Sequence, residues 1–139
     1  KYAVLSQALK KHGRIINPYQ ALQVYGGFEI ATMVGAMLEA GRNRMVVMVD
    51  GFIASSAALV AIRLDPNLKP YLIFAHQAVV IGHKELLLEL GVKPVLQLSM
   101  RLGEGTGVAL ALPIIQCAAA MLCDMATFAS ASVAKRNVP

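Results

Sequence analysis

Three of the eight acidic residues stand in apolar or glycine-rich surroundings, where a carboxylate must find a partner or shift its pKa. Glu29 lies in the segment Gly-Gly-Phe-Glu-Ile, and Asp50 follows the apolar run Val47–Val49. Glu104 lies in the turn Arg-Leu-Gly-Glu-Gly-Thr-Gly, residues 101–107. Because such positions are often functional sites or specific hydrogen bonds, these three carboxylates are the first candidates for chemistry.

Glu104 is the strongest candidate for an acid/base group. The glycines on both sides allow a substrate to approach closely, and the helix expected after them offers unpaired N–H groups to an anion or a polar ring. The alternative is that Glu104 is a capping carboxylate, stabilised by the dipole of that helix. The spacing of the residues does not separate these two roles.

Two further motifs have a functional and a structural interpretation. Asp50-Gly51 could bind a ribose hydroxyl, as acidic residues at strand ends do in nucleotide-binding α/β folds, or Asp50 could cap the next helix. Gly26-Gly27 could hold a phosphate on backbone N–H groups, although a plain turn is the simpler interpretation. Glu29, in the first turn of a helix, most simply compensates the helix dipole.

Other kinds of site have little support in the sequence. His76 and His83 have no partner at metal-ligand spacing, and we expect Cys117 and Cys123 to be buried, reduced thiols of a cytoplasmic protein. No phosphate-binding Walker loop, complete dinucleotide fingerprint or nucleophile elbow is present. We therefore predict no metal and no cofactor, which leaves a carboxylate-driven reaction on a small anionic ligand, or no catalysis.

The composition limits the class of partner. The net charge of +5 comes from scattered bases, with Lys10, Lys11 and Arg14 as the one cluster, so nucleic-acid binding is not expected. With 57% apolar and 15% charged residues, we expect either a dense core with buried elements on both sides of a sheet, or an exterior that packs in part against a second domain or subunit. No apolar signal segment is visible at the N-terminus, and this favours the cytoplasm.

The elements that must position these residues can be read from the periodicity. Helices are predicted at 3–12 and 18–24, with Asn17 as N-cap and Pro18 at the first helical position. A third helix, ended by Gly41, has apolar residues at helical spacing. These residues are Ile30, Met33, Val34, Met37 and Leu38.

An alternation of strands and helices follows. Strands are predicted at 45–49, buried on both faces, at 71–74 and at 94–98, with helices at 53–63 and 82–90. This order predicts a single α/β domain with a parallel sheet. Ligands bind beyond the carboxyl ends of the strands in such sheets, and the candidate residues should gather there.

A last helix is predicted at 105–125. Its uncharged stretch 105–123 is nearly long enough to span a membrane, but Pro113 and Gln116 lie in its middle and no aromatic belt flanks it. We therefore predict a core helix and no membrane contact.

Three motifs together resemble a known family. They are Tyr25–Ile30 (Tyr-Gly-Gly-Phe-Glu-Ile), Val49–Ile53 (Val-Asp-Gly-Phe-Ile) and the turn 101–107. In this order, over nearly the whole chain, they are similar to the nicotinate-nucleotide:dimethylbenzimidazole phosphoribosyltransferases of cobalamin biosynthesis. The Arg-Leu-Gly-Glu-Gly motif before a helix of small residues is quite specific to that family.

The resemblance implies a doubly wound α/β enzyme with a mostly parallel sheet flanked by helices, which works as a homodimer. Residues 1–139 would form the C-terminal part of one domain, and the N-terminal helices would join a small helical subdomain. The implied reaction moves the 5-phosphoribosyl group of nicotinate mononucleotide onto 5,6-dimethylbenzimidazole or a related base. Its products are nicotinate and α-ribazole 5′-phosphate, the precursor of the lower ligand of cobalamin.

The resemblance also assigns roles to residues. Glu104 would be the general base, Leu102 and Gly103 would border the acceptor base, and Asp50 and Gly51 would lie against the ribose phosphate. Lys1 would contact the phosphate. The other residues that we assign to substrate binding are Gly26, Gly27, His76, Arg101 and Gly105.

Two departures from the family are expected to matter. Where the family carries Ser-His, a second serine and an acidic residue, this chain has Ala75, His76, Ala78 and Val80, so one phosphate contact is missing. The family's N-terminal half, with a glycine-rich phosphate loop, lies outside these residues, and we expect this piece alone to be inactive. The alternative function is a catalytically silent homologue that binds a nucleotide or pairs with an active subunit.

Overall fold

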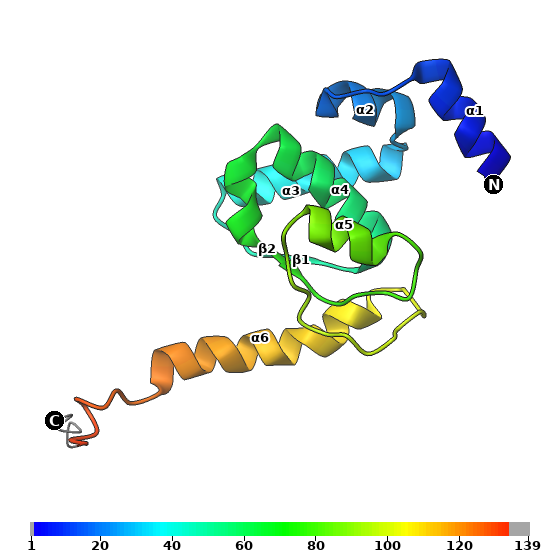
Figure 1. Ribbon diagram of the computed structural model, residues 1–139. Coiled ribbons are helices and arrows are strands. Elements are labelled where there is room, and N and C mark those ends of the chain that lie inside the picture. Colours follow the sequence, from blue (N-terminus) through cyan, green and yellow to red (C-terminus); the bar gives the residue numbers. More distant parts are fainter. Residues whose placement is uncertain (1, 134–139) are drawn as a thin grey trace, which may run out of the picture.

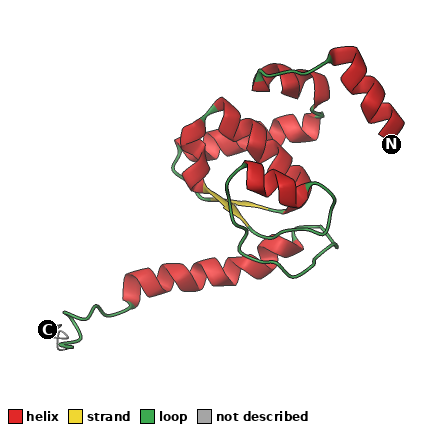
Figure 2. Ribbon diagram, viewed as in Figure 1, coloured by secondary structure: helices red, strands yellow, loops and turns green. Residues whose placement is uncertain are grey.

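The computed structural model describes residues 2–133 and is mostly helical (Figures 1 and 2). In chain order the elements are α1 (Tyr2–His12), α2 (Pro18–Tyr25), α3 (Phe28–Arg42), β1 (Val47–Val49), α4 (Gly51–Leu64), the 3₁₀ helix η1 (Pro66–Tyr71), β2 (Leu72–Phe74), α5 (His83–Glu89) and α6 (Thr106–Asp124). The predicted helices are all found, and only η1 was not foreseen. Asn17 caps α2 as predicted, since its side chain accepts hydrogen bonds from the first-turn amides.

The sheet of the described residues consists of β1 and β2, which pair in parallel. Val47 lies opposite Leu72 and Val49 opposite Phe74, and the chain crosses between the strands through α4 and η1. This βαβ unit confirms the predicted α/β class with parallel strands. The first strand was predicted at 45–49, but β1 begins at Val47 and is shorter. Met45 lies outside the strand and is largely exposed.

The predicted strand at 94–98 is wrong in extent. A single parallel bridge joins Leu96 to His76, and the Val95 amide donates to the Phe74 carbonyl. Pro94 has no N–H to add to a ladder, and Ser99 turns the chain away with a left-handed φ of 53°. The segment therefore touches the sheet edge without extending the sheet.

The core lies where α3 and α4 pack together over the two strands, with α5 against α4. Three alanines of α4, Ala57, Ala58 and Ala61, have no exposed surface, and their small side chains let neighbouring elements approach closely. The other buried apolar members are Val34, Met37, Val49, Leu68, Leu72, Phe74, Leu87 and Leu90.

The apolar face predicted for the third helix is confirmed in α3, but the predicted end of this helix at Gly41 is not. Val34 and Met37 are buried, and the rest of the stripe packs around them. The helix passes Gly41 and ends at Arg42. Gly41 instead allows close packing, because a Cβ there would come within 2.5 Å of Leu68 Cδ1.

The two ends of the described chain pack least. No residue of α1 is buried, and α6 runs outward from the strand ends (Figure 1). The prediction of a core helix is wrong for the described residues, since only Gly107 and Ala111 of α6 are buried. Cys117 and Cys123 are free and exposed rather than buried. Among residues 2–133, α6 is the one helix that is long and apolar enough to cross a membrane by length and composition.

Candidate active site at the strand ends

A cavity of about 360 Å³ lies at the carboxyl ends of β1 and β2. Its lining contains six of the predicted site residues, which come from both strand ends and from the turn before α6. The lining residues are Asp50, Gly51, Phe52, Ile53, His76, Ala78, Val80, Arg101, Gly103 and Glu104. The structure thus gathers the candidates at the edge where the predicted parallel sheet would bind a ligand.

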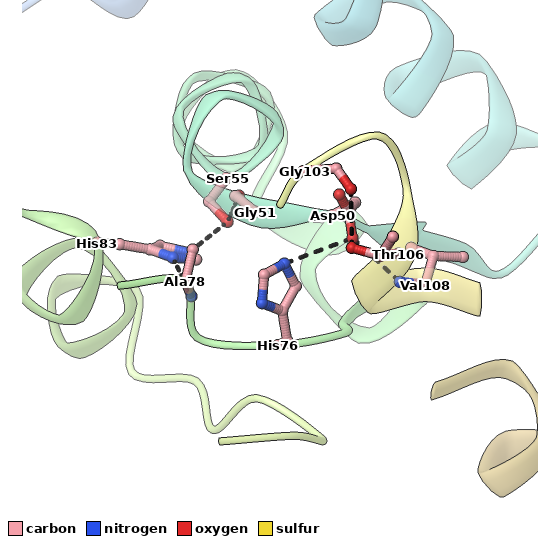
Figure 3. Close-up of polar contacts among 9 residues, drawn as sticks. All are labelled: Asp50, Gly51, Ser55, His76, Ala78, His83, Gly103, Thr106 and Val108. Carbon is pink, nitrogen blue, oxygen red and sulfur yellow. Dashed lines mark hydrogen bonds and ion pairs between the residues drawn. The ribbon is translucent and has the colours of Figure 1, made fainter. Parts of the chain in front are cut away.

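Asp50 holds the start of α6 in place. Its Oδ1 accepts a hydrogen bond of 3.0 Å from the Val108 amide in the first turn of that helix (Figure 3). Asp50 stands at the N-cap position of α4, but its side chain makes no capping bond there, so the alternative that Asp50 caps the next helix was wrong. A carboxylate at this end of α6 is also favoured by the helix dipole.

Gly107 makes this contact possible. A Cβ at this position would lie 2.6 Å from Asp50 Oδ1 and would overlap the ring of His76. Any larger residue would therefore separate the first turn of α6 from the strand ends. Sequence reasoning treated Gly107 only as part of a turn, although a third glycine at a helix start is a signal for close approach.

His76 is buried and has free bonding capacity. It is 3% exposed, and its Nε2 lies 3.5 Å from Asp50 Oδ1, at ion-pair distance (Figure 3). Neither ring nitrogen has a hydrogen-bond partner within the described part of the chain. Unpaired buried nitrogens are costly, so this ring lacks a hydrogen-bond partner that the described residues do not supply.

Glu104 sits in a strained turn at the cavity. Its φ of 57° lies between those of Gly103 (84°) and Gly105 (77°), and the turn is closed by the Thr106 amide and hydroxyl, which donate to the Gly103 carbonyl. A left-handed conformation at a residue other than glycine costs energy and often marks functional sites. The Glu104 side chain is exposed, with no hydrogen bond or ion pair to any residue between 2 and 133.

The capping role considered for Glu104 is therefore filled by another residue, because Asp50 accepts the first-turn hydrogen bond of α6. The amides of Thr106 and Val108 bond within the chain, so the prediction that the first-turn amides are free for a ligand was wrong for these two.

The remaining predicted residues lie elsewhere. Leu102 is 72% exposed and, like Gly105, is not part of the cavity lining. Gly26 and Gly27 line a separate hollow of about 390 Å³ between α2 and α3. Lys1 lies outside the described residues.

Two residues that the sequence analysis did not assign to the site, Ser55 and His83, lie behind the cavity wall. His83 is fully buried, and its Nδ1 accepts a hydrogen bond of 3.0 Å from the Ala78 amide. Its Nε2 lies 3.1 Å from Ser55 Oγ, which donates to the Gly51 carbonyl at 2.7 Å. Burial lowers the pKa of His83 below its ordinary value, and the nearby His76 lowers it further.

Comparison with known proteins gives one family for this chain. The family model DBI_PRT, described as phosphoribosyltransferase, matches residues 1–133. The chain belongs to this family. It is 55% identical over 139 residues to the nicotinate-nucleotide–dimethylbenzimidazole phosphoribosyltransferase of Ralstonia nicotianae, and 52% identical over 136 residues to that of Aromatoleum aromaticum. The resemblance found from the motifs is thus confirmed.

Comparison with solved structures gives the same family. The crystal structure of nicotinate-nucleotide–dimethylbenzimidazole phosphoribosyltransferase from Thermus thermophilus matches 94% of this chain, with a TM-score of 0.85 and 35% identity. The matched part is 39% of that chain, and it is 39% and 40% of the Ralstonia and Aromatoleum proteins. The chain therefore spans about two fifths of the length of the relatives that it matches.

Proposed function

We propose that these residues form the C-terminal part of an enzyme that transfers the 5-phosphoribosyl group of nicotinate mononucleotide to 5,6-dimethylbenzimidazole or a related base. A ring nitrogen of the acceptor forms a bond to the anomeric carbon as the bond from that carbon to nicotinate breaks. The pyridinium leaves with the bonding electron pair as a neutral ring, so it needs no acid. The acceptor loses one proton, and the product is α-ribazole 5′-phosphate.

Glu104 is the general base in this proposal, and its position carries the argument. An exposed carboxylate with no partner among residues 2–133 lies at a cavity of a size that suits small ligands. The left-handed turn that places it there is closed by two hydrogen bonds from Thr106 to the Gly103 carbonyl. Attack at the anomeric carbon passes through a cationic sugar, which a nearby carboxylate stabilises before it takes the acceptor's proton.

The other lining residues would bind the nucleotide. Asp50 Oδ1 accepts a hydrogen bond from the Val108 amide of α6. The second carboxylate oxygen of Asp50 would therefore accept a hydrogen bond from a ribose hydroxyl beside Gly51. The cation of Arg101 suits the anionic parts of the substrate, and the ring of His76 lines the same cavity. Leu102 and Gly103 would border the acceptor ring, and Lys1, Gly26, Gly27 and Gly105 would contribute only in the complete protein.

The test is the substitution Glu104→Gln in the protein at its full natural length. Loss of a general base should lower kcat for nicotinate release by about 10² or more, with little change in folding. Glu85→Gln, which removes an exposed carboxylate from the first turn of α5, is the matched control. Near-normal turnover of the Glu104 variant would discard the mechanism.

The proposal includes a homodimer in the cytoplasm. The support is the large number of exposed apolar side chains on α1 and α6, which require cover in an aqueous compartment. Light scattering on the full-length protein should give twice the mass of one chain. The mass of a single chain would reject the dimer.

A catalytically silent homologue is the second candidate. Ala78 and Val80 line the cavity where the family carries a serine and an acidic residue, so one wall offers no hydrogen bonds from side chains. Calorimetry with nicotinate mononucleotide, alongside an assay for nicotinate release, separates the two functions. Binding without release would favour the silent homologue.

A further inference from the structure

We infer that Ser55 and His83 act as a positioning pair, which fixes the cavity wall without touching the ligand. Both side chains are buried, at 1% and 0% exposure, so neither can contact a molecule in the cavity directly. They come from α4 and from the first residue of α5, which are far apart in the chain. The kinetic part of this inference rests on the proposed function, whereas the hydrogen-bond network does not.

The hydrogen bonds of the pair have one consistent direction. The Ala78 amide can only donate, so Nδ1 of His83 must be the acceptor and carry no proton. The neutral ring then carries its proton on Nε2 and donates to Ser55 Oγ. The serine hydroxyl is left to donate to the Gly51 carbonyl, so every polar atom of the pair is used.

The pair supports the cavity from behind at several points. It bonds directly to the backbone of two lining residues, Gly51 and Ala78. The imidazole also meets the rings of two more, Phe52 at a centroid distance of 5.8 Å and His76 at 6.4 Å, both edge to face. A network that joins the ends of both strands in this way keeps the two sides of the cavity at a fixed separation.

Protonation would break this network. A proton on Nδ1 of His83 would face the Ala78 amide, and two donors cannot bond to each other. Two titratable groups face the ring of His83. His76 disfavours a positive charge on His83, and Asp50 favours it. The geometry therefore requires a neutral His83 for an intact wall.

The test compares two neighbouring serines in the protein at its full natural length. Ser55 and Ser56 both donate to the carbonyl four residues earlier on α4, but only Ser55 contacts His83. Ser55→Ala should lower kcat/KM for nicotinate mononucleotide about tenfold, the usual effect of a lost buried hydrogen bond. Ser56→Ala should leave kcat/KM unchanged.

A spectroscopic measurement tests the network without any activity. Nitrogen-15 spectra of labelled histidine should show His83 as a neutral ring protonated on Nε2 at pH 7, in the wild type and in Ser56→Ala. A ring protonated on Nδ1, or equal kinetics of the two serine variants, would overturn the inference. An inactive wild type with the expected spectrum would reject the proposed function but retain the network.

His83→Asn provides a second variant in case Ser55→Ala does not fold. Its side-chain oxygen can accept from the Ala78 amide in place of Nδ1, but nothing reaches Ser55. The positioning role requires that this variant lose kcat/KM about as much as Ser55→Ala, close to tenfold. Activity equal to wild type would show that the link through Ser55 is dispensable.

Discussion

The two ends of α6 have the same apolar character but opposite surroundings. Near its start, Gly107 and Ala111 are buried against the strand ends, where Asp50 holds the first turn. Near its end, Leu122 is 87% exposed and Met121 is also largely exposed. Composition alone therefore does not tell which part of an apolar helix is buried, and the contacts at the carboxylate decide it.

The first comparison concerns the core and the outer end of α6, and it has the largest expected effect. Leu87→Ala removes a side chain that is 2% exposed and should lower the free energy of unfolding by about 2–5 kcal/mol. Leu122→Ala removes a side chain that is 87% exposed among the described residues, so any loss above about 0.5 kcal/mol measures the cover that the rest of the protein or a second subunit gives to α6. Urea unfolding of the full-length protein measures both variants, and a loss at Leu122 below about 0.5 kcal/mol would contradict the proposed cover of α6.

The second prediction concerns two glycines inside helices. Gly107→Ala should cost about 1–3 kcal/mol, because its Cβ must push away His76 and Asp50. Gly35→Ala, in open space on α3, should instead stabilise the protein by roughly 0.5–1 kcal/mol through helix propensity. Thermal unfolding should give a lower Tm for Gly107→Ala and a higher Tm for Gly35→Ala than for the wild type. An unchanged Tm of the Gly107 variant would contradict the close contact.

The third prediction compares two caps. Asp50→Ala removes the acceptor for the Val108 amide and should destabilise by about 1 kcal/mol. Asn17→Ala removes the cap of α2, in the loosely packed N-terminal region, and should mainly fray that helix. Hydrogen exchange separates the effects, since the first should expose α6 amides and the second only α2 amides.

The smallest expected effect is a dependence of stability on pH. The pKa of His83 is lowered by burial, so the folded protein favours the neutral ring. This contribution is fully present above the ordinary value of 6.5 and is lost as the pH falls through 6.5 towards the lower folded pKa. Urea midpoints between pH 7.5 and 5.5 should fall less for His83→Asn than for wild type, whereas exposed His12→Gln should follow wild type.

The sequence predicted most elements because their signals are local. Asn17-Pro18 starts a helix by capping, and the stripe of α3 has a clear period of 3.6 residues. The burial of α6 could not be predicted in this way, because a helix that is apolar on all sides has no hydrophobic period to show which face is buried.

Part of the cavity lining was predictable from residue types, but the contacts among its residues were not. The turn around Glu104 and the strand end at Asp50 were found from residue types, and the structure brings them to one cavity. The bond from Asp50 to Val108 and the pair of Ser55 and His83 join segments that are distant in the chain. Such contacts depend on tertiary packing, which spacing along one sequence does not encode.

The bond between Asp50 and Val108 spans 58 positions of the chain, and this sets an order of events during synthesis. A ribosome delivers the strand end and its carboxylate first, and the Val108 amide that bonds to this carboxylate emerges 58 residues later. β1 and β2 can pair before then, but the loop that joins Asp50 to Val108 can close only after both residues have emerged. The nascent chain therefore contains Asp50 well before the cavity at the strand ends can form.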